Sequence, residues 1–296
     1  MFKNPTSKKN VFFVISGVLV IISLISFFVR GFNYDIDFSG GTSFQIALGK
    51  EYTSDMEDTV NSIISEISGN TAQIQKTGDG TEMLIKTSEL TNEQQTEVVE
   101  KLKESFGIDQ SGILNVEKVG ETVSKRLIGD SFKAVLIAII LMLIYITFRF
   151  DFQSGTSAVI ALAQDVILML GAYSLFQLPI STSFIAAVLT IVGYSINATI
   201  VVFDRVRENT KMMRKSSYNE IASKSIYQSY TRAINSSLTT LFTIGALYIL
   251  GVTSIRQFAL PIIIGIFCGT YSSLFIAPNF WAFWKESGVK GKRTGR

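Results

Sequence analysis

The chain has 296 residues, of which 47% are hydrophobic and only 17% are charged, with a mean hydropathy of +0.34. This balance is too apolar for an ordinary soluble domain and indicates several membrane spans. The sequence contains no histidine and a single cysteine, Cys268, which we expect to pack in a core. These counts exclude Ser-His-Asp catalysis, imidazole metal sites and intrachain disulfides. We therefore expect no enzymatic activity, no metal and no cofactor, and any proton chemistry must use carboxylates.

The net charge of +3 is divided unevenly along the chain. Residues 31–120 hold 6 basic and 16 acidic residues, a net charge of −10, and the rest of the chain carries +13. An acidic block inside a basic, apolar remainder predicts a water-exposed domain on a membrane protein.

Six apolar stretches are long enough, or nearly so, to cross about 30 Å of hydrocarbon as helices. They lie at about 11–29, 131–149, 157–177, 183–203, 233–250 and 257–277. The first stretch is long and lacks a small-residue cleavage site, so we interpret it as a retained span and not as a signal peptide. The predicted organisation is an amino-terminal region with the first span (1–30), an outer domain (31–120), the other five spans with a cytoplasmic loop at 204–231 (121–281), and a basic tail (282–296).

The basic residues predict the orientation of these spans. The amino-terminal lysines, Arg149, the basic residues between 205 and 224 and the tail "KGKRTGR" all fall on one side if six spans are counted. The short loops on the other side carry only Arg256. Because basic residues accumulate on the cytoplasmic side, both termini are predicted to be cytoplasmic and the acidic domain extracytoplasmic.

The acidic domain has a readable order of elements. Residues 36–48, "IDFSGGTSFQIAL", alternate like a strand, with Gly40 and Gly41 as a bend or bulge. A helix follows from a Ser/Asp cap at 54–55, then a hairpin around Gly78-Asp79-Gly80, a second capped helix at 91–107 and a last strand at 113–119. The predicted order β-α-β-β-α-β is the ferredoxin-like motif, which serves many functions and identifies none.

Polar side chains occur in three of the predicted spans, all in the half of the membrane nearer the cytoplasm. Gln164 and Asp165 lie in the third span, and Arg232 lies at the edge of the fifth. The other polar residues of this set are Ser195, Asn197 and Thr199 in the fourth span and Asn235, Ser236, Ser237, Thr239 and Thr240 in the fifth. Serine, threonine and asparagine commonly join helices by hydrogen bonds. A carboxyl at mid-membrane costs roughly 3 kcal/mol, so Asp165 is predicted to serve transport or proton coupling, with a silent protonated carboxyl as the alternative.

Five stretches together resemble the SecF family, whose members partner SecD in protein export and are related to RND transporters. They are "IDFSGGT", "VGETVSKRL", "QD" in the third span, "GYSINATIVVFDRVREN" and "TRAINSSLTTL" with the later "GTYSS". The resemblance covers nearly the whole chain in the right order. It implies a multi-pass protein of the bacterial plasma membrane that uses the proton-motive force to assist export. The implied partners are SecD, the SecYEG channel and the unfolded secretory polypeptide.

The resemblance also implies which residues form the site. Carried over position by position, the intramembrane polar site is Asp165, Asn197, Thr199, Arg232 and Gln164, and the motif at the start of the outer domain is Asp37, Gly40 and Gly41. The family usually has Asp where this chain has Ala198, His where it has Gln164, and Pro where it has Glu121. The first of these departures removes a carboxyl thought to carry protons, by natural divergence or by engineering.

Two other functions stay open at the level of the sequence. The chain is either a structural subunit that holds SecD without an ion path of its own, or half of an RND-type exporter of small molecules or lipids. The basic run 205–215 indicates contact with anionic membrane lipid far more than with nucleic acid. "GIFCG" at 265–269 predicts a close-packing helix face.

Overall fold

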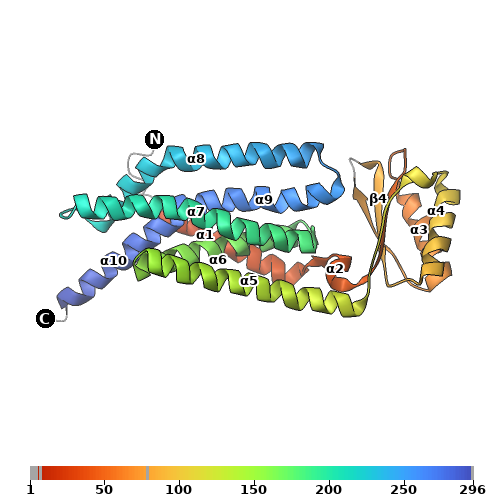
Figure 1. Cartoon of the computed structure of the whole chain (residues 1–296), viewed down its shortest axis with the longest axis horizontal. Coiled ribbons are helices and arrows are strands. Elements are labelled where there is room, and N and C mark those ends of the chain that lie inside the picture. The colour runs from red at the N-terminus through yellow and green to blue at the C-terminus, as the bar shows by residue number, and fades with distance from the viewer. Residues whose placement is uncertain (1–5, 7–8, 78–79, 295–296) are drawn as a thin grey trace. The chain divides into compact units, whose positions relative to one another are not determined.

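A computed structural model describes residues 6, 9–77 and 80–294 (Figure 1). The chain divides into two compact units. The first is Met1–Asn33 with Phe132–Pro179 and Ser183–Arg296, and the second is Tyr34–Ser131 with Ile180–Thr182. The first is a helix bundle, and the second contains the four-stranded sheet.

The described residues contain six helices long and apolar enough to cross a membrane, as predicted. Five are α1 (Lys9–Arg30), α5 (Glu121–Arg149), α6 (Phe152–Leu175), α7 (Thr182–Met212) and α8 (Tyr218–Leu250). The sixth is built from α9 (Thr253–Tyr271), a π-helical segment η4 (Ser272–Ile276) and α10 (Ala277–Thr294).

The predicted loop 204–231 is mostly helical, which corrects the sequence interpretation. Helix α7 continues to Met212, and α8 already begins at Tyr218. A capping box between Ser217 and Glu220 fixes the start of α8, because each side chain accepts a hydrogen bond from the other residue's backbone N–H. Only residues 213–217 connect the two helices.

Small and hydroxyl-bearing residues bring α1 and α6 together. A Cβ added to Gly171 would lie 2.0 Å from Ser23 Oγ, so only glycine admits this approach. One turn further along, Ser26 Oγ and Ser174 Oγ are 2.9 Å apart. The large apolar side chains of α1 and α5 point outward instead, as a lipid-facing surface requires.

The second unit is a ferredoxin-like domain with the predicted β-α-β-β-α-β order. Its elements are β2 (Gly41–Ala47), α3 (Ser54–Ser68), β3 (Gln73–Thr77), β4 (Glu82–Thr87), α4 (Asn92–Phe106) and β5 (Ile113–Val119). The strands lie in the order β3-β4-β2-β5 and all neighbours are antiparallel. The remaining elements are the two-residue strands β1 (Asn33–Tyr34) and β6 (Pro179–Ile180), the short helix α2 (Ile36–Ser39) and the 3₁₀ turn η3 (Gln110–Gly112).

The helices of this domain cover one apolar core. One face of α3 contributes buried Val60, Ile63 and Ile64, and Phe44 and Ile85 of the sheet are fully buried against the helices. Helix α4 has the predicted cap, since Thr91 and Gln94 form a capping box and Gly107 closes the helix at a φ of 66°.

Two local predictions for this domain differ from the structure, and a third falls partly outside the described residues. Residues 36–39 form α2 and not a strand, because Asp35 caps that turn by accepting a hydrogen bond from the Ile36 N–H. The residue that precedes α3 is Thr53, whose side chain makes no capping hydrogen bond, so the predicted Ser/Asp cap at 54–55 is wrong. Two residues of the predicted turn, 78 and 79, lie outside the described residues, although β3 and β4 pair on either side of it.

Candidate functional site

Asp165 lies at the centre of the bundle, on the buried face of α6. Its side chain is 0% exposed, and its neighbours one turn earlier on α6 are the small Ala161 and the apolar Leu162, which are also buried. No ion pair in the described part of the chain includes Asp165. A buried carboxylate without a cation is costly, so its hydrogen bonds decide what it can do.

Two serines from two other helices donate to the same oxygen of Asp165. Ser195 Oγ of α7 donates to Oδ2 at 2.6 Å, and Ser272 Oγ of the π-helical segment donates to it at 2.9 Å. The other oxygen, Oδ1, is buried and has no hydrogen-bond partner among the described residues. The carboxyl group therefore connects three spans by hydrogen bonds, and its Oδ1 stays without a partner among the described residues.

A second pair of hydroxyls extends this cluster by one turn along the same face of α7. Ser273 Oγ lies 2.8 Å from Thr199 Oγ1 and donates to the backbone carbonyl of Ser195 at 3.2 Å. The π-helical turn inserts at this point of the sixth span, and such insertions are frequent at functional sites. We call Asp165, Ser195, Thr199, Ser272 and Ser273 the carboxyl cluster.

The glycines of "GIFCG" allow α9 to approach α7 closely, as the sequence predicts. A Cβ on Gly265 would lie 2.4 Å from Ile191 Cγ1, and one on Gly269 would lie 3.0 Å from Ser195 Cβ. This close packing brings the π-helical segment within reach of Asp165.

Gln164 takes part in a different contact from its neighbour Asp165. Its Nε2 donates to Ser16 Oγ of α1 at 3.3 Å, and Ser16 Oγ donates to the Tyr271 hydroxyl at 3.2 Å. The Tyr271 hydroxyl in turn donates to the carbonyl of Phe12 at 2.9 Å. Gln164 thus joins α6 to α1 and the sixth span, and does not contact the carboxyl cluster directly.

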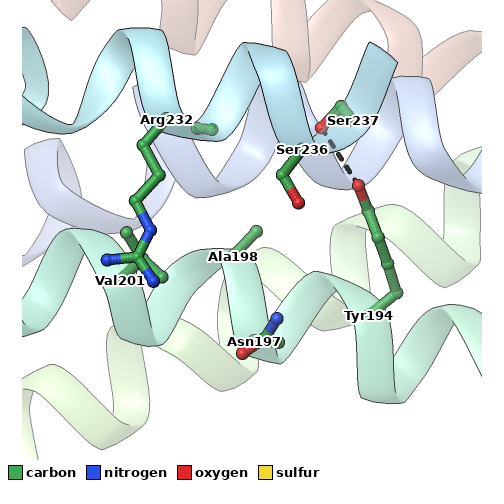
Figure 2. Close-up of a pocket in the computed structure, with 8 residues that line it drawn as sticks. Tyr194, Asn197, Ala198, Val201, Arg232, Ser236 and Ser237 are labelled. Carbon is green, nitrogen blue, oxygen red and sulfur yellow. Dashed lines mark hydrogen bonds between the residues drawn. The ribbon is translucent and has the colours of Figure 1, made fainter. Parts of the chain in front are cut away.

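Asn197, Ala198 and Arg232 line a separate cavity of about 70 Å³ between α7 and α8. In Figure 2, Arg232 reaches from α8 toward α7 beside Val201, and Ala198 projects between the two helices. The Tyr194 hydroxyl closes one end of the cavity by donating to Ser237 Oγ at 3.3 Å. An Asp at position 198, where this chain has Ala, would therefore point its carboxyl toward this cavity.

The predicted residues accordingly divide between two places. Thr199 belongs to the carboxyl cluster, whereas Asn197 and Arg232 belong to the α7–α8 cavity. Successive residues of an α-helix are about 100° apart, so Asn197 and Thr199 point to nearly opposite sides of α7. In the fifth span, Thr239 and Thr240 donate to the carbonyl of Ser236, and among the described residues neither hydroxyl donates to another helix.

Sequence reasoning overlooked Ser272 and Ser273 as part of an intramembrane site. The available signal was two consecutive serines inside the sixth apolar stretch, which we used only for the resemblance. It also overlooked Asn209, which is 2% exposed and donates to Ser225 Oγ and Gln228 Oε1 near the end of α7.

The motif at the start of the ferredoxin-like domain shapes the backbone. Asp37 Oδ2 accepts hydrogen bonds from the backbone N–H and the hydroxyl of Thr182, at 2.8 and 2.7 Å, within the same compact unit. Gly41 has a φ of 128°, and a Cβ there would lie 2.3 Å from the carbonyl oxygen of Thr87. Gly40 has a φ of 72° and ends α2. The hydrogen bonds of Asp37 and the positive φ angles of the two glycines therefore fix the local conformation of the chain.

Comparison with known proteins gives consistent matches over most of the chain. Residues 98–287 match the family model of the protein export membrane protein SecD/SecF, C-terminal, and residues 25–51 match that of the SecD/SecF GG motif. The protein translocase subunit SecF of Petrotoga mobilis is 38% identical over 279 residues, which cover 91% of this chain and 92% of that protein.

Two further matches are to SecDF proteins, of which this chain spans only a part. The protein translocase subunit SecDF of Thermus thermophilus is 39% identical over 93% of this chain and 38% of its own length. The crystal structure of SecDF from Thermus, described as a translocon-associated membrane protein, matches with a TM-score of 0.85 at 37% identity, over 95% of this chain and 38% of that one. The fold, the motifs and these relatives agree: the chain belongs to the SecD/SecF family of protein export membrane proteins.

Proposed function

We propose that this chain is a subunit of the Sec protein-export machinery that uses the proton-motive force to assist the translocation of secretory polypeptides. The relatives that match over nearly their whole length are protein translocase subunits. The observation that carries the proton-coupled mechanism is the geometry of Asp165, a buried carboxyl shared by three spans with one oxygen unpartnered.

Asp165 is the proposed proton acceptor. Its Oδ1 can take a proton without displacing the two serines that donate to Oδ2. Protonation removes the charge, so the hydroxyl donors lose the strong acceptor that holds α6, α7 and the π-helical segment together. A proton moving through the membrane potential supplies about 2.3 kcal/mol per 100 mV, enough to shift a packing equilibrium of modest cost.

SecD is the proposed partner that covers the exposed polar face of α8. Arg232, Asn235, Ser236 and Thr239 are exposed, although they lie inside an apolar helix. Polar groups at this depth need a protein partner, because lipid tails cannot bind them. Within the described residues Arg232 has no ion pair, so SecD would supply an acceptor for its guanidinium. The SecDF relatives, in which both parts form one chain, support this pairing.

The proposed orientation places both termini in the cytoplasm and the ferredoxin-like domain outside it. It rests on the distribution of basic residues along the sequence. The ferredoxin-like domain would then meet the polypeptide as it leaves the SecYEG channel.

The test is export of a secreted reporter in cells depleted of their own SecF but containing SecD. Export gained from this chain is compared with that from Asp165→Asn, with and without an uncoupler of the proton gradient. We expect the gain to need the gradient and Asp165→Asn to lose most of it while inserting normally. The matched control is Asp204→Asn, which removes an exposed carboxylate paired with Arg149 on the same bundle.

A structural subunit is the second candidate, and Ala198 favours it. If Asp165→Asn exports as well as the unchanged chain, Asp165 is not the proton carrier and the ion path lies in SecD. Ala198→Asp addresses the same question from the α7–α8 cavity, because it restores the family's carboxyl opposite Arg232. A gain of gradient-dependent export in that variant alone would assign the coupling to the restored carboxyl.

A further inference from the structure

A second, larger cavity lies at the end of the bundle where α5 turns into α6 and α7 leads into α8 (Figure 1). It has a volume of about 260 Å³ and is separate from the carboxyl cluster. Its aromatic wall includes Phe150, Phe203 and Trp281, and its basic residues are Arg207, Lys211 and Lys285. All of them belong to one compact unit.

The charges around this cavity do not balance. Lys285 Nζ forms an ion pair with Asp151 at 2.7 Å, so these two charges offset each other. Arg207 and Lys211 are exposed and have no ion pair in the parts of the chain that are described. Among the lining residues, three basic side chains face one acidic side chain, which leaves two positive charges available to an anion.

Trp281 adds a buried aromatic ring to the lining of this cavity. The side chain is 2% exposed, and an edge contact with Tyr218 at 5.6 Å holds the ring. Its Nε1 has no hydrogen-bond partner among the described residues, but this atom is too buried for a ligand in the cavity to touch. The cavity thus combines an aromatic wall with unused positive charge.

The position of the cavity favours a lipid as the source of the anion. It opens beside the first turn of α6 and beside the charged continuation of α7, where the apolar parts of both helices end. Tryptophan and basic residues at such a level meet lipid headgroups. The volume is below the range of roughly 300–1,000 Å³ typical of pockets that enclose a whole small molecule, so it suits a headgroup whose acyl chains stay outside.

We propose that this cavity binds the phosphate of an anionic membrane phospholipid. Arg207 and Lys211 neutralise the phosphate, and the glycerol region lies along the aromatic wall of Phe150, Phe203 and Trp281. Because the cavity wall comes from α7, α10 and the turn between α5 and α6, the bound lipid holds these elements together.

Tryptophan fluorescence of the full chain tests this proposal. The chain contains two tryptophans, and Trp284→Phe leaves Trp281 as the only reporter. This variant is reconstituted in phosphatidylcholine bilayers that contain increasing fractions of brominated phosphatidylglycerol or, separately, brominated phosphatidylcholine. We expect the brominated anionic lipid to quench Trp281 at a much lower fraction than the brominated zwitterionic lipid.

Charge variants locate the site. Arg207→Gln and Lys211→Gln should each reduce the preference for the anionic lipid about fivefold, the factor that corresponds to about 1 kcal/mol per basic residue. The charge-preserving Arg207→Lys should restore most of it, which separates loss of charge from misfolding. Lys224→Gln is the matched control, since Lys224 is an exposed basic residue of α8 that does not line the cavity.

Two results would overturn the proposal. Equal quenching by the two brominated lipids, or an unchanged preference in the Arg207→Gln and Lys211→Gln double variant, would show that the cavity does not select an anionic lipid. Inorganic phosphate forms the third arm: if it abolishes quenching by the anionic lipid as effectively as unbrominated phosphatidylglycerol does, the site takes free phosphate and not a lipid.

Discussion

The ferredoxin-like domain and the helix bundle differ in the polar side chains that lie among their buried apolar residues. The domain has a core of Phe44, Ile64, Met83 and other apolar residues, and its charged residues lie outside that core, although Lys86 is buried and forms an ion pair with Asp35. The bundle encloses hydroxyls, amides and Asp165, while the large apolar residues of α1 and α5 are exposed. Water drives apolar groups into the core of the ferredoxin-like domain. Lipid gives no such drive, so the bundle is held by close approach of small residues and by interhelical hydrogen bonds.

The residues that stabilise this chain are therefore expected to differ from those that carry its function. Apolar burial makes the domain stable, whereas a buried carboxyl with an unpartnered oxygen adds little or nothing to the stability of the bundle. Substitutions in the two interiors should therefore have effects of different size and kind.

The largest loss of stability is expected from Phe44→Ala in the domain. Phe44 is fully buried, and removing its ring should cost about 3–5 kcal/mol through lost burial and the cavity left behind. Hydrogen exchange of the full chain measures this as loss of protection in the amides of β2 and β4. Unchanged protection would mean that the apolar core does not hold this sheet. The control is Val116→Ala on β5, since Val116 is 37% exposed.

A smaller loss is expected from Gly171→Ala in the bundle. The new Cβ would lie 2.2 Å from Ser23 Cβ and 2.8 Å from Ser23 Cα, so α1 and α6 must separate. Overpacking of this kind costs about 1–3 kcal/mol. Thermal unfolding of the chain in detergent measures the loss, with Gly17→Ala as control because nothing lies within 4 Å of a Cβ there. Equal stability of the two variants would contradict close α1–α6 packing.

The smallest effect on stability is expected from Asp165→Leu. An apolar side chain of similar size removes the buried carboxyl, and Ser195 and Ser272 can turn to backbone carbonyls of their own helices. The thermal midpoint should stay the same or rise, while gradient-dependent export falls as in Asp165→Asn. A large drop in the midpoint would instead make Asp165 a structural residue.

Much of the fold could be predicted from the sequence because its signals are local. Six apolar stretches predicted six spans, and alternating and helical periodicities predicted the β-α-β-β-α-β order. Errors occurred where a polar segment continued a helix, as in α7 beyond residue 203, and where a short turn such as α2 interrupted an apparent strand. In both places a side chain at a helix end decided the boundary: Ser217 for α8 and Asp35 for α2.

Composition, periodicity and motif order are properties of neighbouring residues, and they were enough to predict the family, the six spans and a carboxyl, that of Asp165, inside the membrane. Only the tertiary structure decided which polar residues meet. It brings Ser273 to α7 and Ser272 to Asp165 of α6, each from more than seventy residues away. Helix rotation and the close approach of α9 to α7 at Gly265 and Gly269 depend on the packing of distant segments, so a local sequence pattern does not predict them.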